Sequence, residues 1–277
     1  MKSLVCCLSV RNCAAFLPAI FRNLDALRRL PIKMHVVFAI DNSTDRSETL
    51  LAEYKSRRPD VVIVKVANTS PLRTVRIARA RNACLGVLSG LSPGPDFHAM
   101  IDADEVNAAQ WDIPFLWQCL NTSDWDSLSF NRPYYYDLWA LMLDQYKYHA
   151  LGLGAHTHRV MDHLRTMLTK ELQGSDGDTV TCLSAFNGFA FYRTPMFAGL
   201  KYTGTYEEFK PLVSDAERQL TLETLRKELD LPELRLMGGY DRGQHCEHLY
   251  YHVRAVRERS AQIRIHKRSM FINSARS

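Results

Sequence analysis

Three carboxylates follow a short apolar run in the first half of the chain. Phe97 to Ile101 predicts a buried strand, and Asp102, Asp104 and Glu105 come directly after it. Side chains two apart on extended chain point the same way, so Asp102 and Asp104 are expected to lie on one side. Two such carboxylates suit Mg²⁺ or Mn²⁺, which takes one or two protein carboxylates and completes its shell with phosphate oxygens and water. An Asp-x-Asp triplet alone is more typical of a solvated turn, so the surrounding elements decide between the two interpretations.

Two further groups of polar residues lie where they could act on a phosphate-bearing ligand. A predicted strand at 34–40 ends in Asp41, at the edge of the sheet where open α/β proteins bind ligands. Asp41 as a simple turn former is the alternative. The helix that Ser70-Pro71 opens carries a row of arginines: Arg73, Arg76, Arg79 and Arg81. At least one of them is expected to supply a cation to a diphosphate, and a solvated basic helix face is the alternative.

The elements that must position these residues alternate between strand and helix. Apolar runs at 3–10, 34–40, 61–66 and 97–101 predict strands, and the first is apolar throughout, as in a strand buried on both faces. Helices are predicted at 14–30, from Asp45 to about Arg57 with capping-box spacing to Glu48, and from Pro71 onward. This order predicts a mostly parallel sheet wrapped by helices. No Gly-x-Gly-x-x-Gly follows the first strand and no P-loop motif exists, which argues against a dinucleotide-type dehydrogenase domain and a P-loop protein.

The ordered set of these stretches resembles glycosyltransferases of the A-type fold, especially the family-2-like group. Four stretches carry the resemblance, over roughly residues 1–110: Val10-Arg11-Asn12, the Asp41-Asn42-Ser43-Thr44-Asp45 loop, Arg79-Ala80-Arg81-Asn82 and Asp102-Ala103-Asp104. It implies a single Rossmann-like α/β domain over 1–277, with a mostly parallel central sheet flanked by helices. Residues 1–110 would form the nucleotide-sugar-binding half, and 111–277 the acceptor-binding half with a C-terminal tail.

The resemblance also implies the ligands and the roles of several residues. The donor would be a nucleoside diphosphate sugar, and the cofactor Mn²⁺ or Mg²⁺. Asp104 would bind the metal directly, Asp102 would lie nearer the ribose or a metal-bound water, and Asp41 would meet the base or ribose. The other donor-binding residues of this half would be Val10, Arg11, Arg81 and Asn82.

An aromatic and acidic stretch follows a strand predicted at 126–130. Its Tyr136-Asp137-Leu138-Trp139-Ala140-Leu141 segment resembles one found in some viral, fungal and bacterial capsule-type glycosyltransferases. Aromatic faces pack on the C–H patches of a pyranose while carboxylates bond to its hydroxyls, so Asp137 and Trp139 are the pair expected to contact sugar. Packing of these aromatics in the core is the alternative.

Thr181 to Tyr192 predicts a strand with a break at Asn187-Gly188. Glycine in a strand allows close approach of a ligand to the backbone. This strand resembles the glycine-containing strand that borders the donor sugar in A-type enzymes, so Asn187 and Gly188 are assigned to the donor site. An amphipathic helix capped by Ser214 is predicted from there to Leu229.

The stretch from Gly238 to His252 is dense in titratable groups. In the family a late Glu or Asp commonly serves as base and a later His can bind the metal. Glu247 matches the base by position, with Asp241 in reserve. His248 and His252 are the matching metal ligands, and they lie on one side of the chain if it is helical. Surface histidines on a helix are the alternative.

Composition sets limits on the remaining possibilities. The 277 residues carry a net charge of +5 and 46% hydrophobic residues, as in a globular protein with a real core, and the positive charge does not gather into one run as nucleic-acid binding would favour. The seven cysteines show no secreted disulfide spacing and are expected to be buried, reduced thiols. No apolar run approaches a membrane span, and Arg11 and Asn12 interrupt any signal-peptide core. We therefore expect a soluble cytoplasmic protein without a transmembrane segment.

The function predicted from these observations is metal-dependent transfer of a hexosyl or pentosyl group from a nucleoside diphosphate sugar to a hydroxyl acceptor such as a glycan, with inversion favoured. A sugar-phosphate nucleotidyltransferase is one alternative, but its glycine-rich loop after the first strand is missing. A non-catalytic carbohydrate-binding or scaffold protein is another, and it predicts no metal-dependent nucleotide binding. A nucleic-acid module would show a steep salt dependence.

Overall fold

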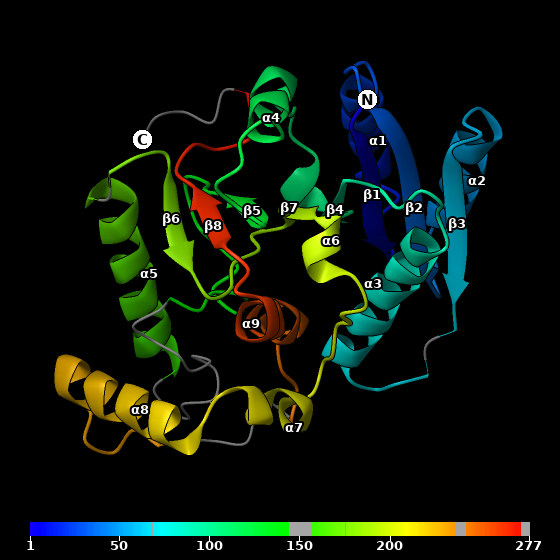
Figure 1. The fold of residues 1–277 in the computed structure, drawn as a ribbon. Coiled ribbons are helices and arrows are strands. Elements are labelled where there is room, and N and C mark those ends of the chain that lie inside the picture. The colour runs from blue at the N-terminus through cyan, green and yellow to red at the C-terminus, as the bar shows by residue number, and fades with distance from the viewer. Residues whose placement is uncertain (68, 144–156, 175, 236–241, 273–277) are drawn as a thin grey trace.

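The computed structural model describes residues 1–67, 69–143, 157–174, 176–235 and 242–272, and within them eight strands form one sheet in the order β3-β2-β1-β4-β7-β5-β8-β6 (Figure 1). The strands are β1 (Ser3–Val10), β2 (Lys33–Asp41), β3 (Val61–Val66), β4 (Phe97–Asp102), β5 (Ser127–Phe130), β6 (Thr179–Cys182), β7 (Phe189–Arg193) and β8 (Ile263–His266). β1 pairs in parallel with β2 and β4, β2 with β3, and β5 with β8. β7 runs antiparallel to β4 and β5, and β6 antiparallel to β8. The predicted α/β fold with a mostly parallel sheet is confirmed.

Helices cover both faces of this sheet. They are α1 (Leu17–Leu27), α2 (Ser47–Ser56), α3 (Arg73–Ser89), α4 (Ile113–Cys119), α5 (Thr157–Gly174), α6 (Thr194–Phe197), α7 (Tyr206–Phe209), α8 (Asp215–Leu229) and α9 (Glu247–Arg259), with 3-10 turns η1 (Glu105–Asn107) and η3 (Lys210–Leu212). α1, α2 and α4 share one buried apolar cluster with the sheet, and α3, α5 and α9 share the other (Figure 1). None of the described helices is long and apolar enough to cross a membrane.

The apolar first strand explains how both clusters form. Leu4, Cys6 and Leu8 belong to the α1 side, whereas Val5 and Cys7 belong to the α3 side. Successive side chains alternate between the faces of a strand, so a strand covered on both faces must be apolar throughout. All seven cysteines are free and buried, as predicted.

The loop after β2 differs from the prediction. Asp45 does not form a capping box with Glu48. Its Oδ1 accepts from the Ser47 backbone N–H at 2.9 Å, and its Oδ2 accepts from the Ala14 N–H, also at 2.9 Å. Hydrogen bonds to Ala14 and Ser47 hold the pKa of the Asp45 carboxyl below its ordinary value, although burial opposes them. Asp45 thus ties the loop after β1 to the loop after β2, and α1 begins only at Leu17 because the preceding residues form this turn.

Two other boundaries also differ. The strand predicted from Thr181 to Tyr192 is two strands, β6 and β7, which lie apart in the sheet because β5 and β8 come between them. The predicted break at Asn187-Gly188 immediately precedes β7, and both residues have positive φ, +80° and +89°. Helix α3 begins at Arg73 rather than at Pro71, because the Ser70 hydroxyl accepts from the Leu72 N–H and Leu72 is extended.

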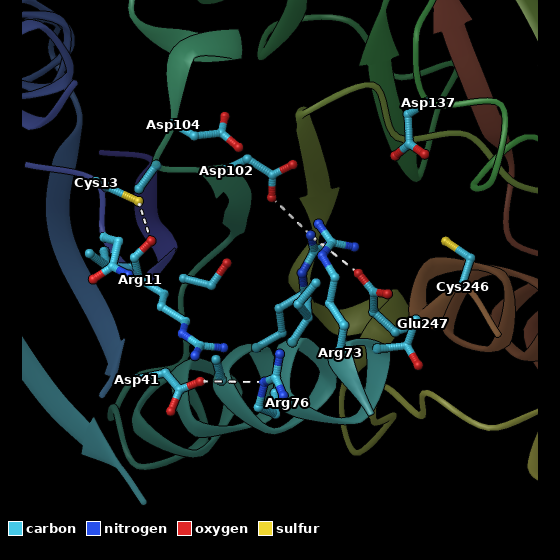
Figure 2. A pocket seen from close by; sticks show the side chains of 18 of the residues that line it. Arg11, Cys13, Asp41, Arg73, Arg76, Asp102, Asp104, Asp137, Cys246 and Glu247 are labelled. Carbon is cyan, nitrogen blue, oxygen red and sulfur yellow. Dashed lines mark hydrogen bonds and ion pairs between the residues drawn. The ribbon is translucent and has the colours of Figure 1, made fainter. Parts of the chain in front are cut away.

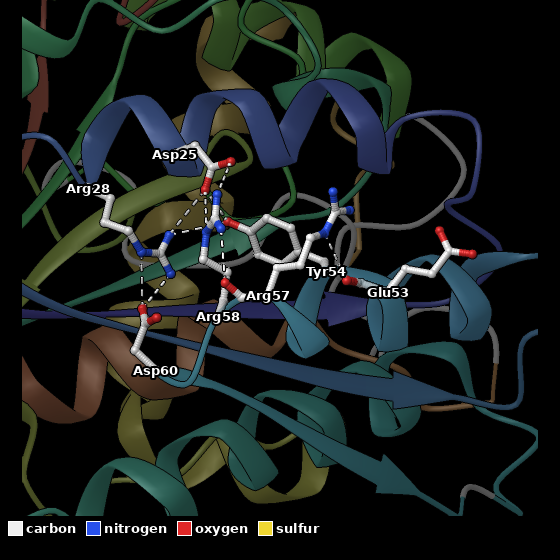
Figure 3. A network of polar contacts seen from close by, with 7 residues as sticks. All are labelled: Asp25, Arg28, Glu53, Tyr54, Arg57, Arg58 and Asp60. Atoms are coloured by element: carbon white, nitrogen blue, oxygen red, sulfur yellow. Dashed lines mark hydrogen bonds and ion pairs between the residues drawn. The ribbon is translucent and has the colours of Figure 1, made fainter.

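A polar network joins α1, α2 and the start of β3 at the opposite end of the sheet from the carboxyl ends of β1 and β2 (Figure 3). Asp25 accepts from the Tyr54 hydroxyl at 2.9 Å and from Arg58 Nη2 at 3.0 Å. Arg28 donates to Asp60 and to the Tyr54 hydroxyl. Burial and Asp25 together raise the pKa of the Tyr54 phenol to about 12, so the hydroxyl remains a donor.

Asp25→Ala is expected to destabilise the fold by about 1–2 kcal/mol, because a half-buried hydroxyl and a guanidinium both lose their acceptor. The urea midpoint should fall with an unchanged slope. Glu53→Ala is the matched control in the same network, since Glu53 contributes its carbonyl, not its carboxylate, to Arg57. A midpoint of Asp25→Ala equal to that of Glu53→Ala and of the unaltered protein would show that the Asp25 carboxylate adds nothing to stability.

Candidate active site

A pocket of about 530 Å³ lies at the carboxyl ends of β1, β2 and β4, between α3 and the start of α9 (Figure 2). It lies at the sheet edge where open α/β proteins bind ligands. Most of the residues predicted from the sequence line it: Val10, Arg11, Asp41, Arg81, Asp102, Asp104, Asp137, Trp139 and Glu247. Asn82, Asn187, Gly188, His248 and His252 are not among its lining residues. Asp241 lies outside the described residues.

Asp102 is the most constrained carboxylate of the pocket. Its Oδ1 accepts from Arg81 Nη2 at 2.9 Å, and its Oδ2 accepts from the Tyr136 hydroxyl at 3.4 Å. Burial raises its pKa to about 7; Arg81 opposes this and Asp104 adds to it. Both oxygens of Asp102 therefore have protein partners before any ligand arrives.

Asp104 has a different environment. It is exposed, and its Oδ1 caps η1 by accepting from the Val106 N–H at 3.2 Å. The described residues contain no group of three His, Cys, Asp or Glu side chains arranged to hold a metal ion. One exposed carboxylate nevertheless suits a hard cation that takes its remaining ligands from phosphate oxygens and water. The donor set thus fits Mg²⁺ or Mn²⁺ through Asp104, with Asp102 held back by its own hydrogen bonds.

Asp41 ends β2 and is 5% exposed. Its Oδ2 lies 4.0 Å from Arg76 Nε, and its Oδ1 has no hydrogen-bond partner among the described residues. A buried acceptor without a partner is uncommon in folded proteins and suggests a missing donor. Its position on the pocket wall suits an N–H or O–H group of a ligand.

Arginines give the pocket a cationic side. Arg73 and Arg76 come from the first turns of α3, and Arg11 from the loop after β1 (Figure 2). Arg73 and Arg11 are exposed, whereas Arg76 is fixed by the carbonyls of Ser70 and Pro71 as well as by Asp41. Three guanidinium groups beside an exposed carboxylate make this side suited to a polyanion held with a metal ion.

The wall across from β1 carries Asp137 and Glu247 (Figure 2). Glu247 is 5% exposed and occupies the first position of α9, where the helix dipole favours a carboxylate. Its Oε1 lies 3.3 Å from Arg81 Nη2. Burial and the nearby Glu247 raise the pKa of the Asp137 carboxyl to about 6, against the effect of Arg81.

The two histidines predicted as metal ligands lie in the core. His248 stacks on Phe186 with ring centroids 3.7 Å apart and is 1% exposed. Both ring nitrogens of His252 have partners, Ser184 Oγ and the Tyr192 hydroxyl, each at 2.9 Å. Burial lowers the pKa of both imidazoles. Neither residue is among those that line the pocket.

Three residues predicted to bind the donor lie outside the pocket lining and contact other parts of the protein. Asn82 makes two hydrogen bonds to the backbone of Tyr202, at 2.8 and 2.9 Å. Asn187 Oδ1 accepts from the Tyr136 N–H at 3.3 Å, so it fixes the segment that carries Asp137. At Gly188 an added Cβ would lie 2.9 Å from Val106 and 3.0 Å from the Tyr136 hydroxyl. Position 188 therefore has to be glycine because protein atoms, those of Val106 and Tyr136, lie close to its backbone.

Sequence reasoning did not select Tyr136, Cys13 and Cys246, all of which line the pocket. Tyr136 directly precedes Asp137 in the segment that resembles one of glycosyltransferases, and this adjacency is the sequence feature that could have indicated it. The two cysteines carried none, because buried thiols are common in any core. Burial raises the pKa of Cys13 to about 11, so its thiol stays protonated.

Comparisons with known proteins give structural similarity only. No protein-family model matches the sequence, and no curated protein matches it. Among solved structures, the chain is similar to residues 1–349 of TarS from S. aureus, with 14% identity and a TM-score of 0.42, over 80% of this chain and 55% of that one. It is similar to the mannosyltransferase PcManGT from Pyrobaculum calidifontis, in complex with GDP-Man and Mn²⁺, with 15% identity and a TM-score of 0.40, over 73% and 47%.

A third similar structure is glucosyl-3-phosphoglycerate synthase from Mycobacterium tuberculosis with Mn²⁺, UDP-glucose and glycerol 3-phosphate, with 14% identity and a TM-score of 0.43, over 82% of this chain and 66% of that one. The chain thus spans about half to two thirds of the length of these structures. These TM-scores are below 0.5, and the pocket itself is the basis for the function proposed below.

Proposed function

We propose that this protein is a glycosyltransferase that binds a nucleoside diphosphate sugar in the pocket and transfers the sugar to a hydroxyl acceptor. The observation that carries the proposal is the division of charge across one cavity (Figure 2). Asp41, Asp104 and the exposed arginines suit a nucleotide and its phosphates on one side. Glu247 and Asp137 lie across from them, where a reacting sugar and its acceptor would meet.

The donor would be held by residues of the first half of the chain. Arg11, Arg73 and Arg76 would contact the diphosphate, which makes charge-assisted hydrogen bonds with guanidinium groups. Asp41 would accept from the base or the ribose. A metal ion on Asp104 would supply Lewis-acid stabilisation of the leaving diphosphate.

Residues of the second half would handle the sugar and the acceptor. Glu247 would accept the proton of the acceptor hydroxyl as general base. Attack from the face opposite the diphosphate would invert the anomeric centre. Asp137 and Trp139 would contact the sugar, with the Asp137 carboxylate accepting from its hydroxyls. The proposed division into a donor half and an acceptor half follows from these assignments.

The experiment that tests the donor site is calorimetric titration with uridine, guanosine, thymidine, cytidine and adenosine diphosphates, each with Mn²⁺ and with chelator. We expect one nucleotide to bind selectively and only with metal. Absence of metal-dependent binding for every nucleotide would reject the proposal and favour a carbohydrate-binding scaffold.

Asp41→Asn is expected to weaken binding of the selected nucleotide about 10- to 100-fold, since the substitution replaces a buried carboxylate acceptor on the pocket wall by a neutral amide. The same titration measures it. Asn42→Ala, the next residue along the chain, is exposed and outside the pocket lining, and it serves as the control. Equal losses in the two variants would indicate a disturbed loop and not a lost contact.

A further inference from the structure

We infer that Arg81 is a positioning residue that holds the base Glu247 and the donor-side carboxylate Asp102 on one guanidinium, and that it is not a ligand of the diphosphate. The inference rests on the proposed function and deepens it. It changes the role that the resemblance implies for Arg81, which is contact with the nucleotide.

The contacts of Arg81 are shared between two carboxylates from distant elements. A single nitrogen, Nη2, lies 2.9 Å from Asp102 Oδ1 at the end of β4 and 3.3 Å from Glu247 Oε1 at the start of α9. The dashed lines at Asp102 and Glu247 in Figure 2 mark these two contacts. The Arg81 side chain is 4% exposed, against 21% for Asp102 and 7% for Glu247. Arg81 lines the pocket together with both carboxylates and has the least exposed side chain of the three.

Aromatic rings fix the guanidinium in this place. Its central carbon lies 4.6 Å from the centre of the Phe186 ring and 5.7 Å from that of Tyr202. Nε and Nη1 are shielded from solvent and have no hydrogen-bond partner among the described residues. In contrast, Arg73 and Arg11 present exposed side chains to the same pocket.

The charges around Glu247 define what this arrangement does to it. Arg81 faces it from α3, Asp102 from β4 and Asp137 from the segment after β5, while His248 Nε2 on its own helix lies 3.9 Å away. Burial and Arg81 lower the pKa of His248, so this imidazole is neutral. Arg81 is then the cation in direct contact with Glu247 among the described residues, and the contact fixes where the Glu247 carboxylate lies.

The arrangement also connects the two sides of the reaction. The same nitrogen fixes the position of Glu247 relative to the end of β4, where the proposed metal ligand Asp104 follows two residues later. A lysine at position 81 would keep the positive charge but lacks the planar guanidinium that packs on Phe186 and Tyr202, so its flexible ammonium group would not be held between both carboxylates.

The test compares two separate variants, Arg81→Lys and the matched control Arg79→Lys. Arg79 lies two residues away on the same helix, is exposed and does not line the pocket. Arg81→Lys is expected to lower kcat about tenfold or more, with nucleotide Kd changed by less than about threefold. In a Glu247→Gln background, Arg81→Lys should cost less than about threefold further, because the two residues act as a unit. A tenfold weaker nucleotide Kd with an unchanged kcat would overturn the inference and make Arg81 a diphosphate ligand.

A second measurement does not depend on catalysis or on Arg81→Lys folding. Nitrogen-15 NMR follows the arginine side chains directly. We expect Glu247→Gln to shift the Arg81 signals, because it removes the charge of the carboxylate that Arg81 contacts. Unchanged Arg81 signals in Glu247→Gln would overturn the inference even if transfer is observed. Failure of the proposed function would appear separately, as absence of nucleotide binding to the unaltered protein.

Discussion

Glu247→Gln is expected to lower kcat for sugar transfer about 10²- to 10⁴-fold, the usual contribution of a general base, while nucleotide affinity changes by less than about threefold. Glutamine keeps the shape of the side chain and an oxygen for Arg81, but it cannot accept the proton of the acceptor hydroxyl. The measurement is steady-state turnover of the donor with saturating acceptor, together with calorimetric binding of the nucleoside diphosphate.

The matched control for this variant is Glu258→Gln on the same helix. Glu258 pairs with Arg254 at the surface and does not line the pocket. It should retain full activity. Turnover of Glu247→Gln close to that of the unaltered protein would contradict the assignment and move the role of base to Asp137 or to Asp241, and the corresponding asparagine variants would then separate these two.

The carboxyl ends of the strands could be predicted because the pattern that defines them is local. An apolar run followed by an acid marks both Asp41 and Asp102, and parallel pairing of β2, β1 and β4 brings those ends to one edge. The Ser214 cap of α8 is also local: the Ser214 hydroxyl accepts from the Glu217 N–H and the Glu217 carboxylate accepts from the Ser214 N–H, all within four residues.

Asp45 shows why the same kind of pattern can fail. It has capping-box spacing to Glu48, yet its carboxylate bonds to Ala14, a residue 31 positions earlier. A tertiary partner that supplies a backbone N–H competes with the local one, and only the folded arrangement of β1 and β2 brings Ala14 near. Sequence spacing contains no information about that approach.

A related reason keeps His252 and Asn82 out of the pocket lining. His252 and Asn82 were selected as polar groups in promising stretches, but their hydrogen-bonding capacity is used by Ser184, Tyr192 and the backbone of Tyr202. These partners lie between 60 and 120 positions away in the sequence. A buried polar side chain must find such partners, and which residue supplies them is a property of the packed core. The distinction between a ligand-binding and a core-satisfying polar residue therefore required the structure.

Asp104→Ala is expected to abolish the metal-dependent part of nucleotide binding. In the unaltered protein, nucleotide and Mn²⁺ at about 100 times Kd should stabilise the fold by about 2.7 kcal/mol, and chelator should remove that stabilisation. Because Asp102 is bound to Arg81 and Tyr136, Asp104 is the exposed carboxylate of the Asp-x-Asp pair, and its loss leaves the proposed metal without a first protein ligand. Thermal melts with Mn²⁺ and with chelator measure the difference.

Glu105→Ala controls for the loss of one negative charge at the same turn. Glu105 is exposed, follows Asp104 directly and does not line the pocket. It should keep the full metal-dependent stabilisation, whereas Asp104→Ala should show the same melting temperature with Mn²⁺ and with chelator. A metal-dependent shift that survives in Asp104→Ala and disappears in Asp102→Asn would reverse the assignment, since it would mean that ligand binding releases Asp102 from Arg81 to hold the ion.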